Sequence, residues 1–250
     1  MSARFAGQVC LITGAAGAGI GQATARRLGS EGAVIAVTDV HEGRTASVTD
    51  ALREEGIDAA GWRMDVADRS EMDRVVAEVA QRFGRIDILV NNAAVNVRAP
   101  FHEVSPEQWD EVVNIDLSSC WYLARAVYPG MLERRTGSIV NVSTVASWIR
   151  GRTESPYAAA KAGLQALTRT IAQEGGPHGI RCNAVAPGIV QSKFLERHMD
   201  SFGHEIEATP LGRFARPEEI ASVIAFLASA DASYVTGETL SVAGGWYMHA

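Results

Sequence analysis

Three side chains near the middle of the chain have the types and the spacing of a proton-transfer site. Tyr157 and Lys161 stand four residues apart. They follow Ser155-Pro156, which predicts the start of a helix with Ser155 as its cap, so both side chains point to one side of that helix. A neighbouring ammonium favours the phenolate form of a tyrosine, and we therefore expect a lowered pKa for Tyr157.

A serine completes this group. Ser143 directly follows the β-type run 137–142, so its hydroxyl lies at a strand end and can hold a substrate oxygen while Tyr157 moves a proton. Without its surroundings, a Tyr-x-x-x-Lys pair is usually a solvated pair on a helix surface. The elements that position these residues decide between the two interpretations.

The start of the chain predicts a nucleotide site. The apolar run 9–13 is typical of a strand buried on both faces, and it leads into a glycine-rich turn, Gly14 to Gly21, and then a helix. Glycines allow a tight turn and a close approach of the backbone to a ligand, and the free N–H groups of the helix start favour a phosphate. A second strand ends on Asp39, where a carboxylate can bind an adenosine ribose; the alternative is a solvated acid in a turn.

Strands and helices alternate along the remaining chain. Further strands are predicted at 33–38, 61–64, 86–90, 137–142, 180–185 and 239–242. This alternation predicts an α/β fold of the Rossmann type, a doubly wound parallel sheet with helices on both faces, in one domain over 1–250. Ligands bind such sheets at the carboxyl ends of the strands. The residues expected there are Asp39, Asp65, Asn92, Ser143 and Pro187-Gly188.

Two helix starts carry capping patterns. Asp68 with Glu71, and Ser105 with Gln108, each predict a capping box. The second helix should reach about residue 134. Asn114 interrupts its apolar stripe, and because a buried amide needs a partner, Asn114 is either a satisfied core residue or part of a site.

Composition limits the classes of partner and compartment. The formal charge of −6 argues against nucleic acid and anionic membranes. Neither a membrane-spanning run nor a signal-peptide pattern is present, and the three cysteines favour buried thiols over a disulfide or a metal site. We expect a cytoplasmic enzyme with no metal. Residues 189–214 break the rhythm of strands and helices, which predicts a lid over a pocket or a plain surface excursion.

These motifs, in this order and spacing, resemble the short-chain dehydrogenase/reductase family over essentially the whole chain. The resemblance implies seven strands, a homotetramer, and hydride transfer between a bound nicotinamide dinucleotide and a carbonyl or alcohol carbon. It implies that Tyr157 is the general acid/base, that Lys161 lowers its pKa and holds the nicotinamide ribose, and that Ser143 holds the reacting oxygen. Asn114 would anchor a water relay to Lys161. The implied cofactor contacts are Gly14, Gly19, Ile20, Gly21, Asp39, Asp65, Val66, Asn92, Tyr157, Lys161, Pro187, Gly188 and Ser192.

Two features bear on the cofactor. The segment Ala15 to Ala18 is one residue longer than the family pattern, so the glycine that faces the pyrophosphate stays open. Asp39 predicts NAD(H) over NADP(H), because a carboxylate binds a ribose diol and repels a 2′-phosphate.

The small-molecule substrate is predicted from the loops beside the reacting carbon. Polar groups there favour a secondary alcohol or carbonyl in a sugar, polyol or hydroxy acid, and apolar residues of the lid favour an acyl or ring compound. We expect substrate contacts from Asn96, Val145, Arg150, Glu154 and Phe194, with Arg150 or Glu154 reaching the pocket. The alternatives are a 3-oxoacyl thioester reductase, on acyl carrier protein or CoA, and a dinucleotide-binding regulatory protein without chemistry.

Overall fold

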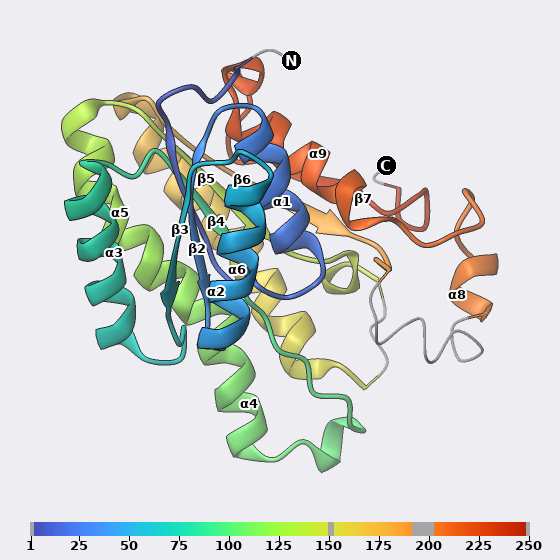
Figure 1. The fold of residues 1–250 in the computed structure, drawn as a ribbon. Coiled ribbons are helices and arrows are strands. Elements are labelled where there is room, and N and C mark those ends of the chain that lie inside the picture. The colour runs from blue at the N-terminus through green and yellow to red at the C-terminus, as the bar shows by residue number, and fades with distance from the viewer. Residues whose placement is uncertain (1–2, 150–152, 192–202, 249–250) are drawn as a thin grey trace.

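The computed structural model of the chain describes residues 3–149, 153–191 and 203–248. Seven parallel strands form one sheet in the order β3-β2-β1-β4-β5-β6-β7 (Figure 1), which confirms the predicted Rossmann-type fold. The order runs in opposite directions from β1, and α/β sheets bind ligands at such a switch point. The strands are β1 (Val9–Ile12), β2 (Val34–Asp39), β3 (Ala59–Arg63), β4 (Ile88–Asn91), β5 (Gly137–Val142), β6 (Ile180–Pro187) and β7 (Thr239–Val242).

Helices cover both faces of the sheet (Figure 1). One face carries α1 (Ile20–Ser30), α2 (Glu42–Glu54) and α9 (Pro217–Ala228). The other carries α3 (Arg69–Phe83), α5 (Ser119–Arg134) and α6 (Ser155–Gly175). Two shorter helices are α4 (Pro106–Val113) and α8 (Gly203–Glu207). This double cover explains why the strands read as continuous apolar runs.

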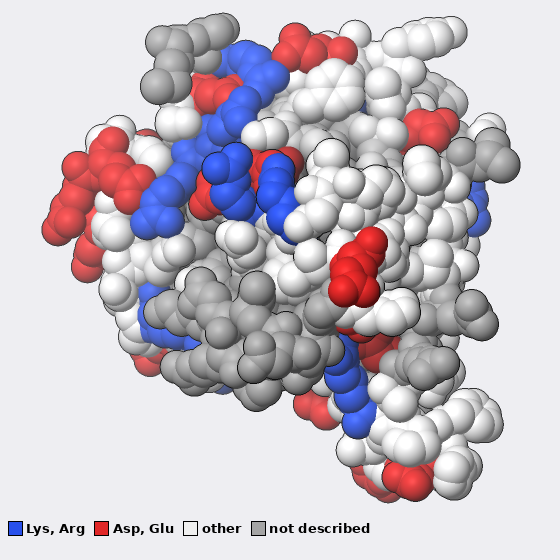
Figure 2. Space-filling view, turned by 90° about the vertical axis from the view of Figure 1, so that its right-hand side faces the viewer, with Lys and Arg blue, Asp and Glu red and all other residues white. Residues whose placement is uncertain are grey.

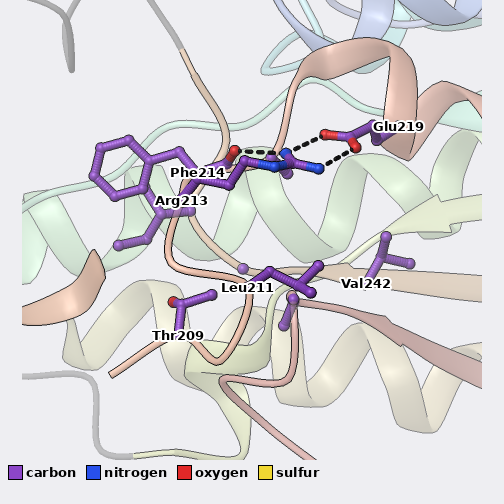
Figure 3. Close-up of a pocket in the computed structure, with 11 residues that line it drawn as sticks. Thr209, Leu211, Arg213, Phe214, Glu219 and Val242 are labelled. Carbon is purple, nitrogen blue, oxygen red and sulfur yellow. Dashed lines mark hydrogen bonds and ion pairs between the residues drawn. The ribbon is translucent and has the colours of Figure 1, made fainter. Parts of the chain in front are cut away.

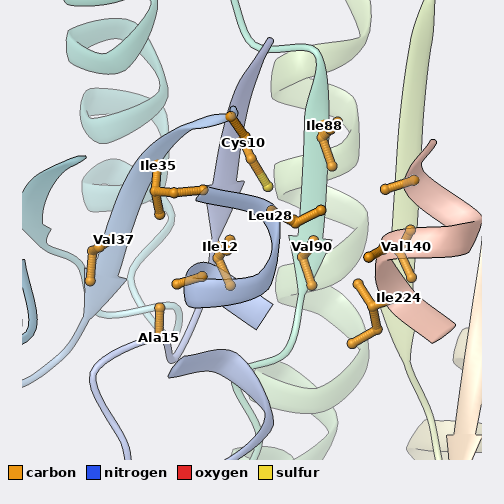
Figure 4. Close-up of a cluster of buried hydrophobic side chains, with 14 of the residues drawn as sticks. Cys10, Ile12, Ala15, Leu28, Ile35, Val37, Ile88, Val90, Val140 and Ile224 are labelled. Carbon is orange, nitrogen blue, oxygen red and sulfur yellow. The ribbon is translucent and has the colours of Figure 1, made fainter. Parts of the chain in front are cut away.

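The core divides into two clusters, one on each face. Cys10 and Ile12 of β1 point to the cluster that Leu28 and Ile224 close from α1 and α9 (Figure 4). The intervening residue Leu11 points to the other cluster. Successive side chains of a strand point to opposite faces, so β1 supplies both clusters and fixes the glycine-rich turn that follows it.

The predicted helix over 106–134 is interrupted by a π-helical turn. α4 ends at Val113, the turn η2 covers Asn114–Ser118, and α5 follows directly at Ser119. Such a turn adds one residue to the helical repeat and therefore rotates the residues beyond it about the axis. Asp116 lies inside this π-helical turn, so the turn determines where its side chain points.

Two of the predicted caps are wrong. Asp68 caps α3 as expected, but a Glu71 oxygen accepts from the Asp65 N–H at 2.8 Å, so the predicted capping box is not formed. α6 begins at Ser155 itself, with Glu154 as the residue before it and no side-chain cap. The capping box of Ser105 and Gln108 is confirmed.

Other expectations concern thiols, metals and membranes. All three cysteines are buried and free, as predicted. Within the described ranges, no group of three or more potential ligands is arranged to hold a metal ion. None of the helices in those ranges has the length and apolar character needed to cross a membrane.

Figure 2 shows basic and acidic side chains lying together on the upper left of this face, with a broad uncharged surface beside them. Arg213 pairs with Glu219 at 2.7 Å, and Arg4 pairs with Asp231 at the same distance. Exposed pairs of this kind contribute little to stability, so we assign them to the surface and not to the site.

Candidate active site

The predicted proton-transfer residues are brought together at the carboxyl end of β5. Tyr157 and Lys161 lie on the first turns of α6, and the Lys161 Nζ lies 5.7 Å from the centre of the Tyr157 ring. Ser143 directly follows β5, and its hydroxyl donates to the Lys161 backbone carbonyl at 3.2 Å. Both Ser143 and Lys161 are buried, whereas Tyr157 is partly exposed.

Gln165, which the sequence reasoning missed, fixes the Ser143 hydroxyl. Its side-chain amide donates to Ser143 Oγ at 3.0 Å and to Ser147 Oγ at 2.6 Å. Ser143 therefore accepts one hydrogen bond from Gln165, and its own proton can turn from the Lys161 carbonyl to a substrate oxygen. The available signal was position, because Gln165 follows Lys161 by four residues and lies on the same side of the helix.

A second missed residue, Asp116, pairs with the lysine. Asp116 is fully buried, and its Oδ2 lies 3.2 Å from the Lys161 Nζ. Its Oδ1 accepts from the Val95 N–H at 2.9 Å, on the loop after β4. Burial raises the pKa of Asp116, opposed by the Lys161 charge and by the Val95 N–H. With the ammonium 3.2 Å from the carboxylate, we describe Asp116 and Lys161 as an ion pair.

The ionisation of Tyr157 differs from the sequence prediction. Burial raises the pKa of Tyr157, and the opposing Lys161 charge does not outweigh it, because Asp116 and Glu154 also disfavour the phenolate. The expected lowering of this pKa is therefore wrong. Burial alone would lower the pKa of Lys161, but the negative charges of Asp116 and of ionised Tyr157 reverse this and raise it.

Asn114 opens the π-helical turn, and its side chain faces the loop after β3. The Asn114 amide donates to the Ala67 carbonyl at 3.1 Å. The amide of this residue therefore ties the helix to a neighbouring loop. The water relay to Lys161 stays a prediction.

The glycines of the glycine-rich turn have different structural roles. Gly14 has φ +62°, and an added Cβ would lie 3.0 Å from the Ala93 backbone, so Gly14 makes the tight turn. Gly21 permits close packing, since a Cβ there would lie 2.5 Å from the Asn92 amide. Gly17 and Gly19 face open space, and Gly19 directly precedes α1. The backbone at Gly17 and Gly19 is therefore open beside the N–H groups that begin with Ile20, which is the arrangement that a pyrophosphate requires. The cofactor contacts stay predictions.

The remaining predicted cofactor residues lie along the same edge of the sheet. The Asn92 amide donates to the carbonyls of Thr13 and Gly14, at 2.9 and 3.1 Å, so its side chain holds the turn in place. Asp65 accepts from the Ala67 N–H at 2.8 Å, and the buried Val66 follows it. Pro187 ends β6, and the Gly188 N–H donates to β7 at 3.1 Å.

Asp39 ends β2 beside the glycine-rich turn. The carboxylate is buried, accepts from the His41 N–H at 3.0 Å and lies 3.4 Å from the Arg44 guanidinium. Burial raises the pKa of Asp39, opposed by Arg44 and by the N–H groups of Ala16 and Val40. An acid at this place fits a ribose diol, and the open glycine backbone beside it fits a pyrophosphate.

A model of the family described as enoyl-(acyl carrier protein) reductase matches residues 14–247. The 3-oxoacyl-(acyl-carrier-protein) reductase FabG of Thermotoga maritima is 40% identical, over 97% of this chain and 98% of that protein. The chain belongs to the short-chain dehydrogenase/reductase family. It is therefore an oxidoreductase, and its cofactor is a nicotinamide dinucleotide. The family membership predicted from the motifs is confirmed.

Other members of the family support this placement. A Mycobacterium tuberculosis protein named (5R,7aS)-5-hydroxy-7a-methyl-1-oxo-2,3,5,6,7,7a-hexahydro-1H-indene-carboxyl-CoA reductase is 38% identical, over 94% of this chain and 92% of that protein. The crystal structure of gox2181 matches with a TM-score of 0.95 and 34% identity, over 98% of this chain and 97% of that one. The homotetramer and the roles of the individual site residues stay predictions.

The predicted polar substrate is wrong. Several family members that are 35–40% identical over nearly the whole chain are named 3-oxoacyl-(acyl-carrier-protein) reductase, which supports the alternative. The structure explains why polar residues in these loops do not indicate a polar substrate. Asn96 and Arg98 both donate to Glu154 Oε1, at 2.9 and 2.8 Å, so these groups bind one another. Arg150, Ser192 and Phe194 lie outside the described residues.

Glu154 thus clamps together the loops that precede α6 and follow β4. A backbone hydrogen bond from Ala99 to Thr153, at 2.9 Å, runs beside it. We expect Glu154→Ala to raise KM more than it lowers kcat, because the clamp shapes the entrance of the active site and touches no reacting atom. The rise in KM should correspond to about 1 kcal/mol of lost substrate-binding free energy.

The matched variant for the clamp is Arg98→Ala, which removes the partner and leaves the carboxylate. Steady-state kinetics of both variants should give the same pattern. An unchanged KM in both would remove the clamp from substrate binding.

An apolar cluster lies next to the site. The rings of Trp148 and Tyr247 stack with their centres 4.8 Å apart, and Val145 and Ala243 belong to the same cluster. Val145 opens the short helix η3 (Val145–Ser147) just after Ser143. The C-terminal segment therefore brings aromatic surface to the loop that was predicted to contact the substrate.

A small cavity lies beside β6 and β7. Its volume is about 90 Å³, and Figure 3 shows Arg213 reaching across its rim to Glu219 and to the Phe214 carbonyl. It is smaller than the roughly 300–1,000 Å³ of ordinary ligand pockets, and none of the four predicted catalytic residues lines it. We therefore assign no reaction to it. The two ends of the predicted lid meet here, where Val190 bridges Ala215, and residues 192–202 lie outside the described ranges.

Proposed function

We propose that the protein reduces the 3-oxo group of an acyl thioester to a secondary alcohol, with NADH as the hydride donor. The observation that carries the proposal is the group of relatives named 3-oxoacyl-(acyl-carrier-protein) reductase, together with the arrangement of Ser143, Tyr157 and Lys161. The apolar cluster of Trp148 and Tyr247 supports an acyl substrate over a sugar.

The positions of the residues support the following roles in this proposal. The Ser143 hydroxyl donates to the 3-oxo oxygen, and Tyr157 passes its proton to that oxygen as the carbonyl carbon is reduced. The bound dinucleotide supplies the hydride. Lys161 stays charged beside the phenol and stabilises the phenolate that remains. Since burial raises the pKa of Tyr157, the phenol is protonated at neutral pH, as a proton donor must be.

The choice of NADH rests on Asp39. Its carboxylate is buried at the end of β2, and the open backbone at Gly17 and Gly19 supports a pyrophosphate beside it. A ribose diol can donate to this carboxylate, whereas a 2′-phosphate would meet its negative charge.

A substrate panel tests the reaction. We expect acetoacetyl-CoA and its N-acetylcysteamine analogue to support NADH oxidation with a higher kcat/KM than crotonyl-CoA or any sugar or polyol in the panel. Crotonyl-CoA tests enoyl reduction, the activity in the description of the matching family. Turnover of crotonyl-CoA without turnover of either 3-oxo thioester would overturn the proposal.

A further inference from the structure

The candidate active site contains a buried ion pair. Asp116 is fully buried and Lys161 is 1% exposed, with 3.2 Å between the carboxylate and the ammonium. The same Lys161 ammonium lies 5.7 Å from the centre of the Tyr157 ring. Removing one partner of a buried pair leaves the other charge uncompensated, which is strongly unfavourable.

The pair also joins three parts of the site. Asp116 lies in the π-helical turn, Lys161 in α6, and Val95, whose N–H binds Asp116 at 2.9 Å, in the loop after β4. The same loop continues to Asn96, which the Glu154 clamp holds. Asp116 thus holds both the Lys161 ammonium and the loop after β4 at the entrance of the active site.

We propose that Asp116 is a positioning residue of the reaction, which fixes the resting place of the Lys161 ammonium and sets how readily the Tyr157–Lys161 pair gives up a proton. The inference rests on the proposed roles of Tyr157 and Lys161 and not on the identity of the acyl substrate.

The electrostatic consequence has a definite sign. Tyr157 and Lys161 are close enough to titrate as a coupled pair, and the negative charge of Asp116 holds the proton on whichever group would lose it first. Other groups facing the pair are the Cys120 thiol on α5, whose pKa burial raises, and Glu154 before α6.

The experiment compares pH profiles of Asp116→Asn and the wild type in both directions. For reduction of a 3-oxo thioester and oxidation of the 3-hydroxy product, the inflection in kcat/KM should move to lower pH by roughly 1–3 pH units, the effect of one nearby charge. A residue that only stabilised the fold would lower the rates or the melting temperature without moving the inflection.

Asp87→Asn is the matched control. Asp87 is also buried, accepts from a backbone N–H at 2.9 Å and binds an arginine at 2.5 Å, but it precedes β4 at the opposite edge of the sheet. We expect Asp87→Asn to lower the melting temperature and to leave the inflection unmoved. A folded Asp116→Asn with the wild-type inflection would overturn the proposal.

A measurement on the wild type does not depend on whether the variant folds or on the substrate. Lys161 and Lys193 are the two lysines of the sequence, so isotope-labelled lysine gives two side-chain signals that Lys193→Arg assigns. In the cofactor-free protein the Lys161 ammonium should stay charged beyond its ordinary pKa of about 10.4. Deprotonation below that value would refute the ion pair, whereas failure of the substrate panel alone would refute only the proposed reaction.

Discussion

Replacing Tyr157 by phenylalanine should lower kcat by about 10²–10⁴-fold, the range that a general acid or base contributes. The ring stays in place beside Lys161, so packing is preserved and only the proton carrier is lost. Dinucleotide affinity, measured by fluorescence titration, should stay near the wild-type value. The expected pattern is a loss in kcat with binding retained.

The matched control for this variant is Tyr128→Phe. Tyr128 is a partly buried tyrosine on α5, it packs against the core, and its pKa is also raised by burial. Loss of its hydroxyl should leave turnover unchanged. Near-normal turnover in Tyr157→Phe, or an equal loss in both variants, would contradict the role of Tyr157.

The raised pKa of Tyr157 has a consequence for the direction of the reaction. A group with a raised pKa keeps its proton to higher pH, so the acid form needed for reduction persists through neutral pH and is lost only in the alkaline range. The pH profile of reduction should therefore be level near neutrality and fall at alkaline pH. In Tyr157→Phe the residual rate should lack this inflection.

Most of the fold could be predicted because its signals are local. The apolar runs mark strands buried on both faces, and the alternation with helices leaves few topologies. Strand ends then place Asp39, Asn92 and Ser143 at one edge, and the helical spacing places Tyr157 and Lys161 on one side. These inferences need no knowledge of how distant side chains pair.

The missed features depend on distant pairing. Asp116 reaches Lys161 from a π-helical turn, which ordinary helical periodicity does not describe. The raised pKa of Tyr157 follows from burial together with Asp116 and Glu154, whereas the sequence alone offered only the neighbouring lysine. Likewise, the sequence could not show that Asn96 and Glu154, both predicted to contact the substrate, bind each other.

The preference for NAD(H) should be large and should depend on Asp39. Two like charges about 4 Å apart interact by about 4 kcal/mol at an effective dielectric of about 20. Arg44, with its guanidinium 3.4 Å from the carboxylate, offsets part of this repulsion of a 2′-phosphate. We therefore expect kcat/KM to favour NADH over NADPH by about 100-fold, which corresponds to about 2.7 kcal/mol.

Two variants should move this ratio in opposite directions. Asp39→Asn keeps the shape of the side chain and removes its charge, so the ratio should fall towards equality. Arg44→Ala removes the cation beside the carboxylate and should raise the ratio, because the repulsion of a 2′-phosphate is then unopposed. Glu42→Gln, which removes an exposed carboxylate at the start of α2, should leave the ratio unchanged. A wild-type enzyme that prefers NADPH, or an Asp39→Asn variant with an unaltered ratio, would show that Asp39 does not select the cofactor.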